Sequence, residues 1–272
     1  MSPRRILLQT GNVMLFQSHG IWVHEKSNKE LISSLKTNLL TNNITVKDIE
    51  STTKDQKNLI WVPQKQSTLL KEPEENYDIT LKLFFLPRSS ESELDLHVKE
   101  AIDAFRQVTG INRIGLVIVS FTGITFDADD DQSLLPSEAE ISRWIRPWRV
   151  LQNLVKEGSI GDLGVSEFSI PRLTHFLSKV EIPPSVNQLN LRDCCVVPKN
   201  LILFAKERGI KLLTHNDCSN ILPDEHLKEV LQTVGYQKTV WSKWVLKYSI
   251  VVRDRGVVEN KGYRYLALVE EK

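Results

Sequence analysis

From residue 80 onward, short apolar segments alternate with longer amphipathic segments, and this alternation limits the folds that the chain can adopt. The apolar segments have the length of buried strands, and the amphipathic segments place their apolar residues at helical spacing. Strands that alternate with helices of about a dozen residues form βαβ units and a parallel sheet. The sequence therefore predicts an α/β protein.

The expected elements follow one another with short connections. We expect strands at residues 6–9, 81–86, 114–120, 163–166, 186–191 and 210–215. We expect helices at residues 28–40, 93–108, 137–158, 170–179, 198–208 and 224–234. The helix at 137–158 begins with a capping box, because Ser137 is followed three residues later by Glu140. The apolar runs at 244–252 and 265–269 do not distinguish a strand from a helix.

Two architectures carry such repeats: a closed (β/α) barrel and an open, doubly wound sheet. The dinucleotide fingerprint G-x-G-x-x-G of the open fold follows none of the expected strands, which favours the barrel. A length of 272 residues suits one barrel domain over residues 1–272. We therefore predict a single TIM-type barrel, in which the ring of strands can be incomplete or irregular. Its N-terminal part, 1–79, is divergent, and 80–272 is the recognisable barrel.

Charge and hydropathy exclude several classes of function. The formal net charge is +1, so no overall field favours nucleic acid or an anionic membrane. No apolar stretch is long enough to span a bilayer, and the apolar run after Arg5 is too short for a secretory signal. The three cysteines form neither a disulfide framework nor a zinc spacing. We expect a reduced cytoplasmic protein without nucleic-acid or membrane partners.

One acidic stretch has the spacing of a calcium loop. Asp127, Asp129, Asp131 and Glu138 occupy positions 1, 3, 5 and 12 of that pattern. Gln132 stands at the turn position that requires glycine, and a strand rather than a helix precedes the stretch. We therefore expect a solvated acidic loop and no metal.

Two stretches resemble the cofactor-binding strands of the aldo-keto reductases. They are Gly164-Val165-Ser166-Glu167-Phe168-Ser169 and Val186-Asn187-Gln188. Residues 114–120 resemble the fourth strand of that family and 81–84 its third, so the resemblance covers about residues 80–260. It implies a barrel of the aldo-keto reductase type, with function at the C-terminal ends of the strands.

By this resemblance, Lys82 occupies the position of the family's catalytic lysine, and Ser120 that of the histidine that orients the carbonyl. A hydroxyl at Ser120 cannot replace an imidazole, and residues 12–60 contain no tyrosine to serve as the acid. A tyrosine can act as an acid near pH 7 only if its pKa is lowered far below its ordinary value. Lys82 has no tyrosine in residues 12–60 whose pKa it could lower. We expect relict positions at Lys82 and Ser120, and no catalytic residues.

Some of the residues that bind the cofactor in the aldo-keto reductases have counterparts in this sequence. Ser166 and Gln188 match residues that hold the nicotinamide amide, and His215 falls where a tyrosine usually stacks on the nicotinamide ring. Glu167 replaces an asparagine, which removes amide donors and adds a charge. A relict site for NADPH is one interpretation. In the other, which we favour, no cofactor binds and Ser166 and Gln188 satisfy backbone groups at strand ends.

A more extensive resemblance is to the regulatory, or modifier, subunits of glutamate–cysteine ligase, a family that is itself aldo-keto-reductase-like. The matching stretches occur in order at residues 8–12, 187–191, 194–196, 204–206, 212–217, 246–249, 255–258 and 261–263. Residues 13–79 match least. The resemblance implies a non-catalytic cytoplasmic subunit that forms a heterodimer with the catalytic subunit of glutamate–cysteine ligase. In that family the heterodimer uses glutamate better and is less inhibited by glutathione.

Four residues are candidates for the partner interface. A thiol of Cys194 or Cys195 could bridge to the partner, although loop packing is the simpler interpretation. Trp241 and Trp244 could anchor an interface, because tryptophan is enriched at binding hot spots, and core packing is the alternative. Two rival functions stay open: an NADPH-dependent aldo-keto reductase with Tyr77 as its acid, and a redox-sensing scaffold with a relict nucleotide site.

Overall fold

The computed structural model describes residues 4–15, 26–50, 59–62, 70–126, 135–190, 197–218 and 220–270. The strands in these residues are β1 (Arg5–Gln9), β2 (Leu59–Val62), β3 (Tyr77–Phe85), β4 (Ile114–Phe121), β5 (Ile160–Ser166), β6 (Val186–Leu189), β7 (Lys211–Thr214), β8 (Val240–Val252) and β9 (Val257–Val269). The α-helices are α1 (Ser27–Thr41), α2 (Val46–Glu50), α3 (Leu94–Thr109), α4 (Glu138–Lys156), α5 (Ile170–Leu177), α6 (Lys199–Glu207) and α7 (Asp224–Gln232). Short 3₁₀ helices occur at Val13–Leu15, Glu74–Asn76 and Glu91–Glu93.

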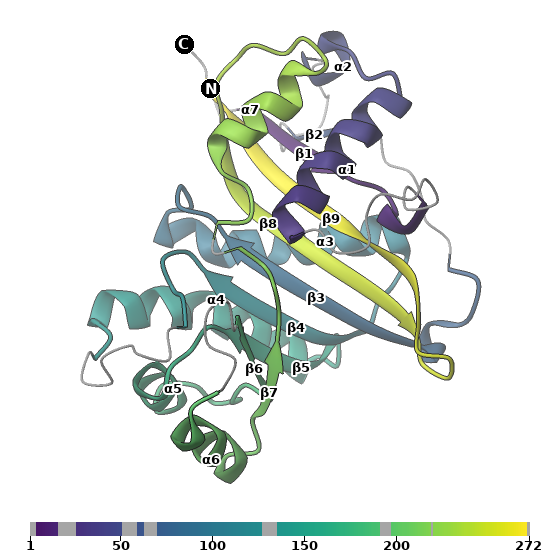
Figure 1. Ribbon diagram of the computed structural model, residues 1–272. Coiled ribbons are helices and arrows are strands. Elements are labelled where there is room, and N and C mark those ends of the chain that lie inside the picture. The colour runs from purple at the N-terminus through teal and green to yellow at the C-terminus, as the bar shows by residue number, and fades with distance from the viewer. Residues whose placement is uncertain are drawn as a thin grey trace.

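The strands form one mixed sheet in the order β2-β1-β9-β8-β3-β4-β5-β6-β7. From β3 to β7, each strand pairs in parallel with the next one along the chain, and α3 to α6 connect them (Figure 1). This is the βαβ repeat that the alternating sequence predicts, so the α/β prediction is confirmed. The expected elements from residue 80 to 234 are all present, with ends that differ by a few residues.

A long antiparallel hairpin makes this barrel irregular. Strands β8 and β9, thirteen residues each, pair with one another and lie between β1 and β3. Their turn contains Gly256 with a φ of 63°, a conformation that glycine adopts at little cost. The apolar runs at 244–252 and 265–269 are therefore strands. Within the described part of the chain, β2 and β7 are the two edges of the sheet.

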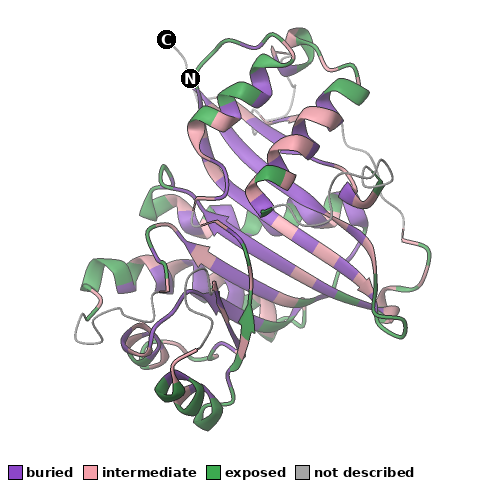
Figure 2. Cartoon of the chain, viewed as in Figure 1, coloured by how far each residue is buried: buried purple, intermediate pink, exposed green. Residues whose placement is uncertain are grey.

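Helices cover both faces of the sheet and bury two apolar clusters. On one face, α1 and α7 pack on β1, β8 and β9, with core residues such as Leu35, Leu231 and Tyr265. On the other face, α3 to α6 form a second cluster around Phe105 and Trp148. Figure 1 shows α1 and α7 in front of the hairpin and α3 behind it, and Figure 2 shows how strongly the centre of the sheet is buried.

Local signals set the ends of the longest helix. In α4, the Ser137 hydroxyl accepts a hydrogen bond from the backbone N–H of Glu140, and the Glu140 carboxylate accepts one from the backbone N–H of Ser137. The predicted capping box is thus confirmed. Gly158, with a φ of 74°, follows the last turn. No helix among the described residues is long and apolar enough to cross a membrane.

Candidate functional site

The sheet brings four of the sequence-predicted residues to one place. Lys82 lies on β3, Ser166 ends β5, Gln188 lies on β6 and His215 follows β7. Ser166 pairs in register with Gln188, and the side chains of paired residues point to the same face of a sheet. Lys82 Nζ donates a hydrogen bond to Gln188 Oε1 over 2.7 Å, although 106 residues separate them along the chain.

A buried carboxylate holds two lysines together at this site. Lys82 on β3 is paired directly opposite Lys247 on β8, an arrangement that is destabilising for two like charges. Asp217 lies between them, with Oδ2 at 2.8 Å from Lys82 Nζ and Oδ1 at 2.7 Å from Lys247 Nζ. Ser27, the first residue of α1, donates to Asp217 Oδ1 over 2.5 Å. One carboxylate therefore joins β3, β8 and α1.

Burial and charge oppose each other in this triad. Asp217 is 3% exposed and Lys82 is 5% exposed. Burial alone would raise the pKa of Asp217, but the ammonium groups of Lys247 and Lys82 outweigh it and hold that pKa below its ordinary value. Burial lowers the pKa of Lys82, and Asp217 limits the decrease. The triad is an ion-pair network in which Asp217 is ionised at neutral pH.

His215 and Glu167 form a second pair beside the first. The backbone N–H of Asp217 donates to His215 Nδ1 over 3.0 Å, which leaves the imidazole proton on Nε2. His215 Nε2 lies 2.5 Å from Glu167 Oε1. The Glu167 carboxylate also accepts hydrogen bonds from the backbone N–H groups of Phe126 and Asn190, at 2.6 and 2.9 Å. Hydrogen-bond donors within the protein thus stabilise the carboxylate of Glu167.

These contacts occupy the groups that a nicotinamide would need. Gln188 Oε1 accepts from Lys82, and Ser166 Oγ lies 3.2 Å from both the Gln188 carbonyl oxygen and His215 Nε2. The imidazole of His215 is held between Glu167 and Asp217. Side chains already bonded to one another gain little by exchanging these partners for a ligand. The residues present therefore fit an internal polar network better than a nicotinamide site.

Ser120 lies next to this network on β4. It pairs in register with Phe84, two residues beyond Lys82 on the neighbouring strand, so it faces the same side of the sheet as Lys82. Its side chain is half-buried. Ser120 thus lies on the same face of the sheet as Lys82, and a hydroxyl there supplies no imidazole to orient a carbonyl.

The tyrosine proposed for the rival reductase lies on the wrong side of the sheet. Tyr77 begins β3, five residues before Lys82, and an odd spacing along a strand puts two side chains on opposite faces. The Tyr77 hydroxyl donates to Glu259 Oε2 over 3.0 Å and accepts from the backbone N–H of Glu72. Tyr77 therefore cannot protonate a substrate held near Lys82, and its prediction as an acid is wrong.

A different tyrosine, missed in the sequence, lies beside the network. Tyr263 on β9 pairs in register with Lys247, and its hydroxyl donates to Glu30 Oε1 over 2.8 Å. Burial and the Glu30 carboxylate raise the pKa of the Tyr263 phenol well above its ordinary value. A reductase acid needs the opposite shift. Tyr263 is therefore held as a neutral hydrogen-bond donor.

Sequence reasoning reached only half of this network. Asp217 follows a predicted strand at the expected functional edge, so a charged residue there was a detectable signal. Tyr263 and Lys247 carry no such signal, because the sequence does not decide whether the last forty residues form strands or helices. Ser27 carries none because it lies in the poorly matching segment 13–79. Only the pairing of the β8–β9 hairpin places Tyr263 and Lys247 beside Lys82.

The interface candidates have different outcomes. Trp244 is fully buried in the main apolar cluster, so its prediction as a surface anchor is corrected and core packing is its role. Trp241 is half-buried, and the Arg88 guanidinium lies 3.5 Å from the centroid of its ring. Cys194 and Cys195 lie outside the described residues. The same holds for the acidic stretch at 127–132, whereas Glu138 is in the first turn of α4.

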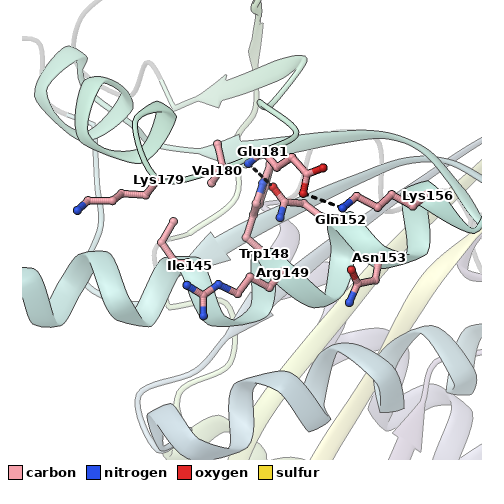
Figure 3. A pocket seen from close by; sticks show the side chains of 9 residues that line it. All are labelled: Ile145, Trp148, Arg149, Gln152, Asn153, Lys156, Lys179, Val180 and Glu181. Carbon is pink, nitrogen blue, oxygen red and sulfur yellow. Dashed lines mark hydrogen bonds and ion pairs between the residues drawn. The ribbon is translucent and has the colours of Figure 1, made fainter.

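A cleft of about 370 Å³ lies elsewhere, between α4 and the segment that joins α5 to β6 (Figure 3). Gln152 Oε1 accepts hydrogen bonds from the backbone N–H groups of Glu181 and Ile182, both at 2.9 Å. Trp148 Nε1 donates to the Ile182 carbonyl oxygen over 2.9 Å. These bonds fasten the connection into β6, at the end of the sheet opposite the Lys82–Asp217 network. The cleft is thus separate from the candidate site.

Comparison with known proteins identifies the family. The model of the aldo/keto reductase family matches residues 40–217. A Schizosaccharomyces pombe protein, provisionally named glutamate–cysteine ligase regulatory subunit, is 31% identical over 96% of this chain and 95% of its own length. The human glutamate–cysteine ligase regulatory subunit is 32% identical over 70% of this chain, and the match spans 65% of the human protein. The chain therefore belongs to the aldo/keto reductase family and to the family of glutamate–cysteine ligase regulatory subunits.

Proposed function

We propose that this chain is a non-catalytic subunit that binds the catalytic subunit of glutamate–cysteine ligase and regulates it. The observation that carries the proposal is the network around Asp217, in which the lysine of a reductase site is bonded to Gln188 and Asp217. The hydrogen bonds of Lys82 go to these two residues and to no tyrosine hydroxyl of the described residues, and the neighbouring Tyr263 hydroxyl is bonded to Glu30. The relatives named as regulatory subunits support the same conclusion.

Regulation by binding requires a difference in affinity between two states of the partner. A subunit that binds the glutamate-competent conformation of the ligase more tightly shifts the population toward that conformation. By linkage, glutamate then strengthens association of the two subunits by the same factor. A conformation that binds glutathione less well accounts for weaker feedback inhibition in the heterodimer. No group of this chain needs to touch the reacting atoms.

The test is a kinetic comparison of the purified catalytic subunit with and without this chain. ATP-dependent formation of glutamyl-cysteine is measured across glutamate concentrations, and again with added glutathione. We expect this chain to lower the Michaelis constant for glutamate and to raise the glutathione concentration needed for half-inhibition. An aldo/keto reductase enzyme at the same concentration is the control for a nonspecific effect. Unchanged glutamate dependence and unchanged glutathione inhibition would contradict the proposal.

A further inference from the structure

Strand β7 is an exposed edge of the sheet. It pairs with β6 on one side, and no strand of the described residues pairs with its other side. In a closed barrel the next strand along the chain would cover that side, but here β8 pairs with β3 and β9 instead. Lys211, Leu213 and Thr214 are exposed, and Figure 2 shows β7 as a largely exposed arrow.

The free edge of β7 directs backbone groups of identifiable residues away from β6, toward a side where no described strand lies. Lys211 N–H donates to the Ser185 carbonyl oxygen over 2.8 Å, and His215 N–H donates to the Leu189 carbonyl oxygen over 3.0 Å. Because the backbone of alternate residues points to opposite sides of a strand, Leu212 and Thr214 direct their N–H and C=O groups away from β6. A strand added at this edge could pair with both residues.

Exposed apolar side chains gather in the same unit. Of the large apolar side chains that are exposed in the described residues, three lie on α6 and β7: Ile202 at 44%, Leu203 at 60% and Leu213 at 41%. Helix α6 precedes β7 directly and packs beside it. Leu213 stands on the strand edge itself, on the same face as Gln188. Leu212 packs against the cluster that α6 covers, so Leu213 and α6 lie on opposite faces of the sheet, and a strand added at this edge would contact both.

The charge around this edge indicates the chemistry of the partner. The exposed charged residues from α6 to the first residue of β7 are four cations and one carboxylate: Lys199, Lys206, Arg208, Lys211 and Glu207. The Glu207 carboxylate is already paired with Arg208, at 3.2 Å. The lysines therefore leave a cationic surface beside the strand edge. Acidic side chains on a partner would complement it.

We propose that the free edge of β7 and the exposed surface of α6 receive an extended segment of the catalytic ligase subunit, with apolar and acidic side chains. The segment adds to β7 as a strand, its main chain pairs with Leu212 and Thr214, and its apolar side chains cover Leu213. Its acidic side chains face the cations of α6. This inference rests on the proposed function, since it names the surface through which the partner binds.

Two substitutions test the inference, and one serves as a control. Thr214→Pro removes an N–H group that points away from β6, so the native ladder is kept and only strand addition is blocked. Leu213→Glu replaces the apolar contact by a charge that repels an acidic segment. Lys228→Glu alters an exposed lysine of α7, away from β7, and is the matched control for a change in charge. Circular dichroism and the melting temperature establish that each variant is folded.

The readout is the dissociation constant for the purified catalytic subunit. We expect Thr214→Pro and Leu213→Glu each to weaken binding by at least about tenfold, and Lys228→Glu to stay within about twofold of the wild type. Wild-type chain that does not bind the catalytic subunit overturns the proposed function and this inference together. Wild-type binding that neither variant weakens overturns the inference alone.

Hydrogen exchange of the wild-type complex gives a second readout that does not depend on any variant. Pairing with a partner strand should protect the amides of Leu212 and Thr214, which pair with no strand of the described residues. Unchanged exchange of both amides in the complex would reject strand addition. A chain that dimerises by itself, in a form that Thr214→Pro abolishes, would assign the edge to a second copy and would also overturn the proposal.

Discussion

At the scale of single residues, Asp217 determines the character of the site. Its carboxylate neutralises Lys82 and Lys247, which the pairing of β3 with β8 places directly opposite each other. Its backbone N–H fixes the tautomer of His215, which in turn faces Glu167. One aspartate thus converts a set of reductase-like residues into a structural network.

Replacing Asp217 should therefore be costly. Asp217→Asn keeps the shape of the side chain but leaves two ammonium groups, one of them buried, without a counter-charge. Loss of one partner of a buried ion pair typically costs about 3–5 kcal/mol in the free energy of unfolding. Urea denaturation at pH 7 measures this loss of stability, and Asp254→Asn, at an exposed aspartate, is the matched control. Equal stability of the two variants would contradict the described role of Asp217.

The same aspartate should make stability depend on pH in a defined range. Its pKa in the folded protein lies below its ordinary value of 3.8, so the unfolded chain binds more protons in acid. Its stabilisation is thus complete above pH 3.8 and is lost as the pH falls below that value. The difference in unfolding free energy between wild type and Asp217→Asn should shrink by about 1.4 kcal/mol per pH unit there. A difference that stays constant from pH 5 to pH 2.5 would reject this assignment.

At the scale of elements, a hydrogen bond attaches α1 to the β8–β9 hairpin. Tyr263 on β9 donates to Glu30 of α1, and Lys261 Nζ lies 2.6 Å from the same carboxylate. Both residues of β9 point toward α1 because they are two apart on the strand. Helix α1 lies within residues 13–79, which resemble the relatives least, and these contacts attach it to the β8–β9 hairpin.

Two buried tyrosines allow a controlled test of this attachment. Tyr263→Phe removes the donor to Glu30 and should lower the free energy of unfolding by about 1–2 kcal/mol. Tyr236→Phe removes a buried hydroxyl that has no hydrogen-bond partner among the described residues, so it should be neutral or stabilising. Chemical denaturation of both variants measures the contrast. A larger decrease in the free energy of unfolding for Tyr236→Phe than for Tyr263→Phe would contradict the account.

The same elements show how far the sequence could predict the fold. Strands β3 to β7 and their helices follow from local apolar patterns, because each parallel strand is buried by helices that lie next to it in the chain. The positions of Lys82, Ser120, Ser166 and Gln188 followed from those strands. The place of β8 and β9 depends on pairing with β1 and β3, far away in the sequence, and no local pattern encodes such a pairing. Lys247 and Tyr263 were missed for that reason.

At the scale of the whole molecule, the sheet keeps the consecutive parallel order of a (β/α) barrel from β3 to β7 and departs from it at both ends. The hairpin lies against β3, and the departure leaves β7 as an edge in the described structure. The change that brings Lys247 next to Lys82 thus also exposes the surface that we assign to the partner. The polar network around Lys82 and the exposed edge of β7 thus have one structural origin.

The central claim is that the reductase-like site is a structural network. Measuring the binding and turnover of NADPH tests this claim most directly. NADPH is titrated into the purified chain while its fluorescence is followed, and oxidation of NADPH is then measured with a panel of aldehydes and ketones. An active aldo/keto reductase is the positive control. We predict no saturable binding and no oxidation that depends on a carbonyl compound. Saturable binding with carbonyl-dependent oxidation, abolished by Lys82→Met, would contradict the account.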